Sequence, residues 1–495
     1  MPHWPRRAVV DIGSNSVRLV IFSGPPRVPV TITNEKALCG LGDRDPETGE
    51  LREEAMQRAL STLRRFRAVI ETEEPETLDV FATAAVRDAP NGHGFLNEIR
   101  DIGFEPRLIS GEKEARLAGL GILCSAPEIK REKIAAIGGD LGGGSLELSL
   151  LGGPRGDVTN MVSLPIGSLS MQARFGTDRK AAAKAVEAYF DELPWLREVP
   201  TPQLYIVGGS WRAIARVAMH QGEHPVPILD HYTMSAEQTV EVCQFVETAD
   251  PEAIGSISGV QKKRVPVLPM AAIVLRKLVE VSRPNKVVVS ACGVREGLLF
   301  DRLPARLRAE EPLFALAEDI AERLSGGRTP HADAVCRLVD PIFDETPAMR
   351  RLRTAAAIMV RMGNMTHPDR RAVHAAATIM AAPFLGIDHI ERTILAVMVK
   401  ARFNGSINKD DPVIPMAVID DEQQEYAVRV GYAHRLASSL RTPLYDEESG
   451  FELELDDGEL LLKVEPRVAD FVAEAAVKDF HRLASAMKLE GRIVS

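Results

Sequence analysis

The segment with the clearest chemical potential is GGDLGGGSLE, at residues 138–147. Gly142, Gly143 and Gly144 have no Cβ atom, so a ligand can approach their backbone closely. Their N–H groups, with that of Ser145, can form a concave nest for a phosphate group. This spacing predicts a phosphate-binding turn, and an ordinary glycine-rich hairpin is the alternative interpretation.

Two carboxylates flank this turn. Asp140 precedes the glycines and Glu147 follows them. Carboxylates beside a bound phosphate normally hold a hard cation between the negative groups, and Mg²⁺ is the usual ion. We therefore expect Mg²⁺ or Mn²⁺ at this position, with K⁺ as a further candidate ion.

A second segment repeats this pattern earlier in the chain. Residues 8–21 read AVVDIGSNSVRLVI and residues 137–150 read IGGDLGGGSLELSL, so that Asp140 follows the equivalent Asp11 by 129 residues. Each copy has an aspartate, a turn of small or polar residues, and then alternating apolar positions. The repetition predicts two strand–turn–strand units in duplicated α/β halves that face each other.

The first copy carries polar side chains where the second carries glycine. Ser14, Asn15 and Ser16 supply hydrogen-bonding groups, and Arg18 follows them. Facing turns of these two kinds could grip one phosphate from both sides, and Asp11 is assigned to the cation by its equivalence to the second aspartate. A lone polar turn would explain the first copy equally well, but its repetition favours the binding interpretation.

A candidate for activating water lies in ISGEKEARLAG, at residues 109–119. Glu114 falls one turn into a predicted helix over 111–124, whose first turn is acidic, as the helix dipole favours. Hydrolysis of a phosphate needs a group that orients or deprotonates the attacking water, and a carboxylate commonly does so. A surface glutamate on an ordinary helix is the alternative.

Two further turns could bind phosphate. Arg87, in ATAAVRDAPNG at 82–92, could bind a second phosphate bidentately or form a surface ion pair. The segment IVGGSWRAIAR, at 206–216, predicts a strand, a turn and a helix N-terminus, which together form an anion site. Its candidate binding residues are Gly208, Gly209 and Ser210.

Other basic residues could extend a track for a polyanion, although solvated helix faces explain them equally well. They are Lys262, Lys263, Arg264, Arg295, Arg350, Arg351, Arg353, Arg370 and Arg371.

The elements that must position these groups alternate between strands and helices. We predict a helix at 51–71, a strand leading into a turn at 78–88, strand–turn–helix units at 203–219 and 286–303, and a helix at 270–282. Such alternation predicts a mostly parallel sheet with functional groups at the strand ends.

The composition changes near residue 306. Most of the remaining chain has a helical pattern, as at 310–324 and 349–403, and the alternation at 451–465 around Asp457 and Gly458 predicts a β-hairpin. The predicted fold class is α/β, with halves at 1–124 and 125–305 and a mainly helical domain at 306–495.

Bulk properties exclude several classes of protein. A chain of 495 residues with a formal net charge of −10 has room for two to four domains and is unlike a basic, non-specific nucleic-acid binder. A local basic tunnel could still hold a polyanion. The five cysteines are scattered without a CxxC pair, and no apolar run approaches a membrane span. We expect a cytoplasmic protein that binds neither nucleic acid nor membrane.

Several catalytic motifs are missing from the sequence. It contains no GxxxxGK[ST], no GxSxG and no HExxH, and no histidine is followed by aspartate. These absences argue against a P-loop enzyme, a serine hydrolase of the elbow type and a His-Asp metal phosphohydrolase.

Taken together, the motifs resemble the exopolyphosphatase / guanosine-pentaphosphate phosphohydrolase family. DIGSNSVRL, ATAAVRDAPNG, ISGEKEARLAG, DLGGGSLEL, VGGS and GVREGLL occur in the family's order across about residues 8–303. The resemblance implies two actin-like (ribonuclease H-like) halves with the active site in their cleft. It also implies Mg²⁺-dependent, processive hydrolysis at a chain end, without a covalent intermediate.

The resemblance also implies roles for individual residues. Glu114 would activate water, Asp140 and Glu147 would hold the metal, and Arg87 would hold a phosphate further along the chain. The terminal phosphate would be bound by Ser14, Asn15, Gly142, Gly143, Gly144 and Ser145.

Two segments depart from the family pattern. Residues 358–369, IMVRMGNMTHPD, lack the metal positions of a His-Asp domain, so the helical region resembles a degenerate one with a structural or substrate-guiding role. Val265 and Pro266 stand where relatives often have a small residue followed by Asp. The second departure weakens any assignment of nucleotide contacts there.

The substrate expected from the resemblance is inorganic polyphosphate, and guanosine pentaphosphate is the alternative at the same site. Guanosine tetraphosphate is a candidate inhibitor, and size and the helical tail favour a homodimer. A sugar-kinase-like ATPase on the same fold and a non-catalytic sensor of these anions are further alternatives. The Glu114 segment and the Arg87 turn argue against the kinase, and the intact carboxylates argue against the sensor.

Overall fold

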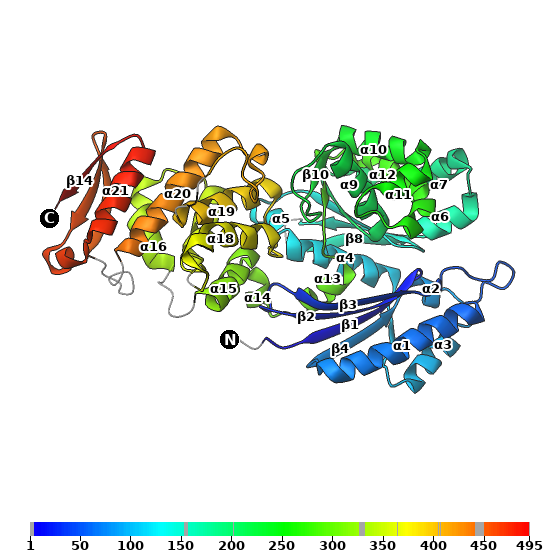
Figure 1. Ribbon diagram of the computed structural model, residues 1–495. Helices are drawn as coiled ribbons and strands as arrows, with labels where there is room; N and C mark the ends of the chain where they lie inside the picture. Colours follow the sequence, from blue (N-terminus) through cyan, green and yellow to red (C-terminus); the bar gives the residue numbers. More distant parts are fainter. Residues whose placement is uncertain are drawn as a thin grey trace. The chain divides into compact units, whose positions relative to one another are not determined.

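The computed structural model describes residues 4–152, 157–200, 202–325, 332–363, 365–403, 405, 407–440 and 450–494. Residues up to Glu310 form one compact unit, and residues from Glu311 onward form a second. The division falls a few residues after the limit at 305 that the composition suggested. Figure 1 labels the elements of both units.

The first unit begins with a five-stranded sheet. Its strands, in spatial order, are β3 (Val30–Leu38), β2 (Ser16–Ser23), β1 (Arg7–Ile12), β4 (Thr77–Ala82) and β5 (Arg107–Leu108). Helices α1 (Glu53–Glu73) and α3 (Gly92–Asp101) cover one face. Apolar residues recur every three or four positions along α1, so that one stripe, which includes Leu63 and Phe66, is buried in the core of this half.

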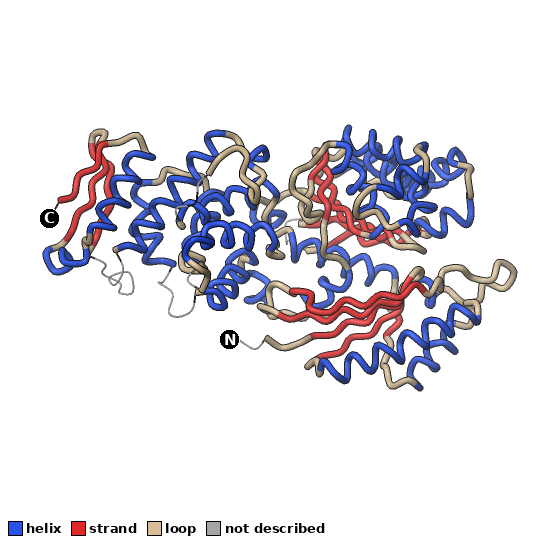
Figure 2. The backbone as a smooth tube through the Cα atoms, in the orientation of Figure 1, coloured by secondary structure: helices blue, strands red, loops and turns tan. Residues whose placement is uncertain are grey.

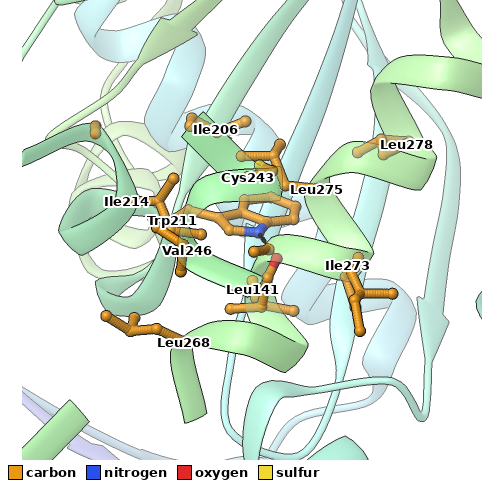
Figure 3. Close-up of a cluster of buried hydrophobic side chains, with 14 of the residues drawn as sticks. Leu141, Ile206, Trp211, Ile214, Cys243, Val246, Leu268, Ile273, Leu275 and Leu278 are labelled. Carbon is orange, nitrogen blue, oxygen red and sulfur yellow. Dashed lines mark hydrogen bonds between the residues drawn. The ribbon is translucent and has the colours of Figure 1, made fainter. Parts of the chain in front are cut away.

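A six-stranded sheet follows in the same unit. Its strands, in spatial order, are β10 (Thr233–Ser235), β11 (Lys286–Val289), β9 (Gln203–Val207), β6 (Ala136–Leu141), β7 (Leu146–Leu151) and β8 (Val158–Leu164). Its core surrounds Trp211 of α9 (Gly209–Gln221), which packs among aliphatic side chains that include those of Ile214 and Leu275 (Figure 3). The indole N–H donates to the carbonyl of Ala271 at 3.0 Å.

The prediction of mostly parallel sheets is wrong. Strands joined through helices do pair in parallel, as β1 does with β4 and β6 with β9. Strands joined by short turns must run back beside their neighbours, so β1–β2–β3 and β6–β7–β8 are antiparallel. Both sheets are therefore mixed. Figure 2 shows the strands of each sheet side by side. The predicted repeat of two strand–turn–strand units is confirmed.

Two helices join the halves of the first unit. Helix α4 (Gly111–Ser125) packs on the second sheet, and α13 (Val294–Asp301) packs against α4. A Cβ on Gly297 would lie 1.8 Å from the carbonyl oxygen of Leu117, so the two helices touch through their backbones. On its other side, Leu299 of α13 joins a buried cluster with residues of β1, β2 and β4. The helix carrying Glu114 is thereby fixed to both sheets.

The remaining elements of this unit surround the two sheets. They are α2 (Ala84–Arg87), α5 (Glu128–Arg131), α6 (Ser168–Phe175), α7 (Arg179–Asp191), α8 (Trp195–Glu198), α10 (Ala236–Thr248), α11 (Pro251–Ser256), η1 (Lys262–Val267), α12 (Leu268–Ser282) and α14 (Ala305–Ala309).

The second unit is mainly helical. Its helices are α15 (Pro312–Leu324), α16 (Ala332–Val339), η2 (Asp340–Ile342), α17 (Pro347–Ile358), η3 (Pro368–Arg370), α18 (Arg371–Ala381), α19 (His389–Arg402), η4 (Met416–Val418), α20 (Asp421–Ser439), η6 (Pro466–Phe471) and α21 (Glu474–Ala486). No described helix of either unit is long and apolar enough to cross a membrane.

A small sheet completes the second unit. The predicted hairpin is confirmed, because β12 (Phe451–Asp456) pairs antiparallel with β13 (Glu459–Val464). The chain then adds β14 (Glu490–Val494) in parallel to β13, which sequence reasoning missed because the intervening helix separates the two strands. Apolar residues of this sheet share a core with α16, α20 and α21.

Candidate active site

A cavity of about 190 Å³ lies in the first unit where the two hairpin turns meet. The predicted residues among those lining it are Asp11, Ser14, Asn15, Ser16, Arg18, Glu114, Asp140, Gly142, Gly143, Gly144, Ser145, Glu147, Gly208, Gly209, Ser210, Arg264 and Arg295. Arg87 lies beside this lining, at the end of the short helix α2 rather than in a turn, and its Nη1 is 3.6 Å from Oε2 of Glu114.

The first turn is held by a loop that follows β3. The Gly13 amide donates to the Ser16 carbonyl at 3.1 Å, which closes the turn. The Ser14 carbonyl accepts from the Gly42 amide at 2.7 Å, and the Asn15 carbonyl accepts from the Gly40 amide at 3.2 Å. Because these backbone groups are committed to the loop, the side chains of the turn remain to face a ligand.

The second turn is held by the start of helix α6. The carbonyls of Gly142 and Gly143 accept from the amides of Ser168 and Leu169 at 3.1 and 2.9 Å. A Cβ on Gly144 would lie 2.9 Å from the hydroxyl of Ser14, so the two turns are in close approach. The glycines are required by this proximity, and the turn presents backbone where the first turn presents side chains.

A third turn, after β9, closes the cavity. Gly208 has a φ of +105°, which favours glycine, and a Cβ there would lie 2.3 Å from the carbonyl oxygen of Leu141. Helix α9 begins at the next residue, Gly209, against which the Arg264 guanidinium packs. The hydroxyl of Ser210 donates to that of Ser168 at 3.4 Å, so it braces the start of α6.

Buried carboxylates meet at one end of the cavity. Ser163 of β8 donates a 2.7 Å hydrogen bond to Oε1 of Glu147. Burial, reinforced by the nearby charge of Asp140, raises the pKa of Glu147 to about 7, against the hydrogen bonds from Ser145 and Ser163. Burial likewise raises the pKa of Asp140 to about 6, although Arg212 and other arginines oppose it.

Glu114 lies at this same end because α4 begins beside β8. Ser110 caps the helix by accepting from the Lys113 amide at 3.1 Å. A Cβ on Gly111 would lie 2.5 Å from that of Ser163, so the first turn of α4 packs next to the serine that holds Glu147. Burial and the neighbouring carboxylates raise the pKa of Glu114 well above its usual range, while Arg87 opposes the rise.

Cations also line the cavity, and they lie among its carboxylates, because Nη1 of Arg295 is 3.6 Å from Oδ2 of Asp11. The lining includes Arg18, Lys36, Arg212, Arg264 and Arg295. Burial, with repulsion by Arg264 and Arg18, lowers the pKa of Lys36 to about 7. Burial and the neighbouring arginines also lower the pKa of Arg18 to about 10. Burial is the first cause of both shifts, and mutual repulsion among these cations adds to it, which a bound polyanion would relieve.

Sequence reasoning missed Lys36 and Arg212. Lys36 lies opposite Arg18 in the β2–β3 pairing, and this register becomes visible only when the sheet forms. Arg212 follows the VGGS turn by two residues and donates from Nε to the Gly208 carbonyl at 3.3 Å. Its position in the first turn of α9, facing a predicted anion site, was the signal available in the sequence.

Part of the proposed basic track serves the second unit instead. Arg353 is buried and pairs with Glu345 and Asp340, the latter at 2.6 Å. Arg351 pairs with Glu311 at 3.1 Å. These arginines are neutralised by carboxylates of their own unit, so the prediction that they extend a track is wrong for both.

The carboxylates of the cavity could hold a divalent cation together with water and phosphate. Among the described residues, no three histidine, cysteine, aspartate or glutamate side chains form a metal site by themselves. Glu147 is nevertheless buried and Asp11 and Asp140 are half-buried on the same cavity, and desolvation is the first cause of the raised pKa of each. Glu114 Oε2 is buried without a hydrogen bond. This donor set fits a hard cation whose other ligands are water and phosphate oxygens.

Comparison with known proteins points to one group of phosphatases. A family model described as the Ppx/GppA phosphatase family matches residues 10–306, and one described as exopolyphosphatase, C-terminal, matches residues 337–493.

Individual relatives carry two different names. The guanosine-5'-triphosphate,3'-diphosphate pyrophosphatase of Photobacterium profundum is 24% identical and covers 81% of this chain and 80% of its own length. Exopolyphosphatase 1 of Mycobacterium tuberculosis is 24% identical and covers 67% of this chain and 98% of its own. A crystal structure of an exopolyphosphatase from Cytophaga hutchinsonii matches with a TM-score of 0.54 and 25% identity, over 60% of this chain and 96% of that one.

Proposed function

The chain belongs to the Ppx/GppA phosphatase family, and from that premise we propose that it removes terminal phosphates from inorganic polyphosphate and releases orthophosphate. One observation carries the proposal. One cavity is lined by two phosphate-type turns, by four carboxylates and by five basic side chains, which are Asp11, Glu114, Asp140, Glu147, Arg18, Lys36, Arg212, Arg264 and Arg295. That arrangement suits an anion whose last phosphate is attacked while the rest of the chain is held.

The terminal phosphate binds between the two hairpin turns. The amides of Gly143, Gly144 and Ser145 supply donors from one side, and the hydroxyls and amide of the first turn supply them from the other. Both turns are braced by hydrogen bonds to neighbouring loops and helices, so little reorganisation is needed when the phosphate arrives. Pre-positioned donors of this kind lower the barrier to phosphoryl transfer.

Glu114 acts as the general base. Its raised pKa and its buried oxygen without a hydrogen bond suit a group that accepts a proton. A water oxygen bonds to the terminal phosphorus while its proton passes to the Glu114 carboxylate. The bond from that phosphorus to the bridging oxygen breaks, and the shortened chain leaves with this oxygen. Arg87, near Glu114, holds a phosphate oxygen.

Beyond the terminal phosphate, the basic side chains of the cavity hold the next phosphates of the chain. Arg18 and Lys36 come from the first sheet, whereas Arg212, Arg264 and Arg295 come from elements around the second. Binding would therefore draw the two halves of the unit onto one ligand. The excess of positive charge there explains how an acidic protein can bind a polyanion.

Asp140, Glu147 and Asp11 would hold Mg²⁺ or Mn²⁺. When bound, such an ion neutralises charge on the phosphate oxygens during transfer. Ser163 would keep Glu147 oriented toward that ion. We further propose a cytoplasmic homodimer as the working form, with K⁺ as an additional ion, in line with the expectations from size and composition.

Guanosine pentaphosphate is the second candidate substrate. Its terminal phosphoanhydride suits the same residues, and the Photobacterium profundum relative, named for a guanosine substrate, matches more of this chain than exopolyphosphatase 1 does. The match of residues 337–493 to an exopolyphosphatase C-terminal model favours polyphosphate.

Phosphate release by the purified full chain tests the proposal. With Mg²⁺ present, long-chain polyphosphate and guanosine pentaphosphate are compared at equal concentrations of terminal phosphate. Faster release from polyphosphate is the expected result, and faster release from the nucleotide would establish the second candidate. Tight binding of either anion without release would contradict an enzymatic role and would favour a sensor.

A further inference from the structure

The second unit gathers four arginines around the carboxyl-terminal end of α19. Arg402 is the last residue of this helix, Arg371 is the first residue of α18, and Arg435 lies in α20. Arg361 follows the end of α17. These residues come from four segments and lie within the second unit, apart from the residues of the catalytic cavity in the first.

Close backbone contacts bring these segments together. A Cβ on Gly431 of α20 would lie 2.5 Å from that of Ala401 and 2.9 Å from the Arg402 nitrogen, so α20 touches the end of α19. Arg435 stands one turn further along α20. A Cβ on Gly405 would lie 2.7 Å from that of Ala372, which places the start of α18 at the same point.

The fourth segment, which contains Arg361, contacts this helix end through an aromatic ring. A Cβ on Gly363 would lie 2.8 Å from the ring of Phe403, and the turn that contains Gly363 follows Arg361 by two residues. The Arg402 guanidinium stands over the same ring, 4.8 Å from its centroid. All four arginines therefore surround one helix end.

Little negative charge acts on Arg402. Asp479 of α21 is the one acid among the charges that act most strongly on Arg402, and it already pairs with Arg435 at 2.7 Å and with Arg482 at 3.7 Å. Burial, followed by repulsion from Arg435, lowers the pKa of Arg402 to about 9, and Arg361 and Arg371 add to that repulsion.

Arg402 also has a polar atom without a partner. Its Nε is buried and makes no hydrogen bond. The neighbouring His434 is buried too, with Nε2 likewise without a partner, and burial together with Arg353 and Arg402 lowers the pKa of this histidine to about 3. The imidazole is therefore neutral and can accept or donate one hydrogen bond.

Arg351, Arg353 and Arg392 of this unit also have a buried guanidinium nitrogen without a hydrogen bond, but their other nitrogens make hydrogen bonds. Arg402 differs from them in its like-charged neighbours. Arg353 is paired with Asp340 and Glu345, and Arg392 donates to the carbonyls of Ile379 and Ala382 at 2.8 Å each. A buried guanidinium with an unmet donor and like-charged neighbours is costly for folding. A bound oxyanion would supply both the missing acceptors and the missing negative charge.

We propose that Arg361, Arg371, Arg402 and Arg435 form a binding site for a compact phosphate-class oxyanion, for which orthophosphate is the simplest ligand. Guanidinium groups match the oxygens of a phosphate bidentately, and several of them at one point prefer a multiply charged anion to chloride. The site is distinct from the catalytic cavity and does not depend on which substrate that cavity hydrolyses.

Hydrogen exchange of the full chain tests the site with orthophosphate as the probe. Orthophosphate is expected to slow amide exchange at residues 398–403 and 427–436, and chloride at matched ionic strength is not. In Arg402→Met the half-saturating phosphate concentration at these residues should rise at least about tenfold, because a charge-assisted contact is lost. Arg337→Met, which removes an exposed arginine of α16, is the matched control and should behave as the wild type.

Exchange at residues 142–145 is read in the same experiment. Phosphate binding in the catalytic cavity should slow exchange there equally in Arg402→Met and in wild type, which separates the two sites. If Arg402→Met fails to fold, Arg371→Met, at a half-buried position, provides the second variant. An unchanged response at 398–403 in these variants would overturn the proposal. Slower exchange at residues 398–403 in chloride would also overturn the proposal. Slower exchange there with long-chain polyphosphate but not with orthophosphate would overturn it as well.

Discussion

The two hairpins of the first unit share a backbone plan and differ in charge. In β1–β2, Asp11 lies opposite Arg18, whereas in β6–β7 the equivalent Asp140 lies opposite Glu147. One exchange of sign thus places a cation in the first hairpin where the second hairpin has a carboxylate. A duplicated unit can therefore divide two tasks, since one copy holds the chain of a polyanion and the other handles the metal and the water.

The turns of the hairpins differ for a steric reason. The second turn is packed against the first turn and against α6, where a Cβ on Gly143 would lie 2.9 Å from the Leu169 side chain. The equivalent glycines that open the two turns are alike, because a Cβ on Gly13 or on Gly142 would have its nearest neighbour at 3.4 or 3.3 Å. The difference lies at the next two positions, which are Ser14 and Asn15 in the first turn and Gly143 and Gly144 in the second. The tight turn binds through backbone amides and the roomier turn binds through side chains.

Among the carboxylates of the cavity, Glu114 should have the largest effect on activity when it is replaced. Replacing Glu114 by Gln removes the proposed base, and kcat should fall about 10²- to 10⁴-fold while polyphosphate binding persists. The measurement is orthophosphate release alongside equilibrium binding. Glu112→Gln, an exposed neighbour on α4, serves as the control. Full activity in Glu114→Gln would sink the assignment of the base.

The difference in packing between the two turns can be tested with one glycine variant in each turn. Gly144→Ala places a methyl group 2.9 Å from the Ser14 hydroxyl and should lower kcat/KM about 10²-fold, because the facing donors are displaced. Gly13→Ala should cost at most about threefold. Steady-state kinetics with polyphosphate gives both numbers, and equal losses in the two variants would contradict the difference in packing.

The metal-binding role proposed for Glu147 in the second hairpin can be tested by titration with Mg²⁺. Glu147→Gln should raise the Mg²⁺ concentration for half-maximal activity about 10- to 100-fold, and chelation with EDTA should stop the wild type. Ser163→Ala, which removes the 2.7 Å hydrogen bond to Glu147, should shift the same titration in the same direction by less. A Mg²⁺ titration that is unchanged in Glu147→Gln would remove this residue from the metal site.

Replacing a basic residue of the cavity should affect substrate binding more than the chemical step. Arg18→Met should raise KM about tenfold with little change in kcat, because one charge-assisted contact to the chain is lost. The same variant should show a weaker dependence of KM on salt. If kcat fell and KM did not change, Arg18 would belong to the chemical step instead.

Lys36 should have the smallest effect of these residues, and it should appear in the pH dependence of KM. Because its pKa is lowered to about 7, the free enzyme loses this charge as pH rises through that value. Binding a polyanion must then restore the proton, so KM should rise about fivefold between pH 7 and pH 8 beyond any change due to other groups. Lys36→Arg keeps its charge and should remove this increment. Identical KM profiles in the two proteins would exclude Lys36 from the effect.

Local patterns in the sequence predicted much of this arrangement. The paired aspartates, the polar and glycine turns, the helix beginning before Glu114 and the hairpin at 451–464 all follow from rules that span a few residues. Glycine spacing, period-two alternation and a serine cap are properties of neighbouring residues. They are therefore readable before any tertiary contact is known.

The tertiary structure decided which distant groups meet. Lys36 enters the cavity through the register of β2 with β3, and Ser163 reaches Glu147 because β8 pairs with β7. The cluster around Arg402 depends on four segments that touch through glycines. Sequence alone determined the kinds of groups available for binding phosphate, and the fold determined their burial, their charge balance and their neighbours. Electrostatic energies depend on distance and desolvation, which packing sets and sequence order does not.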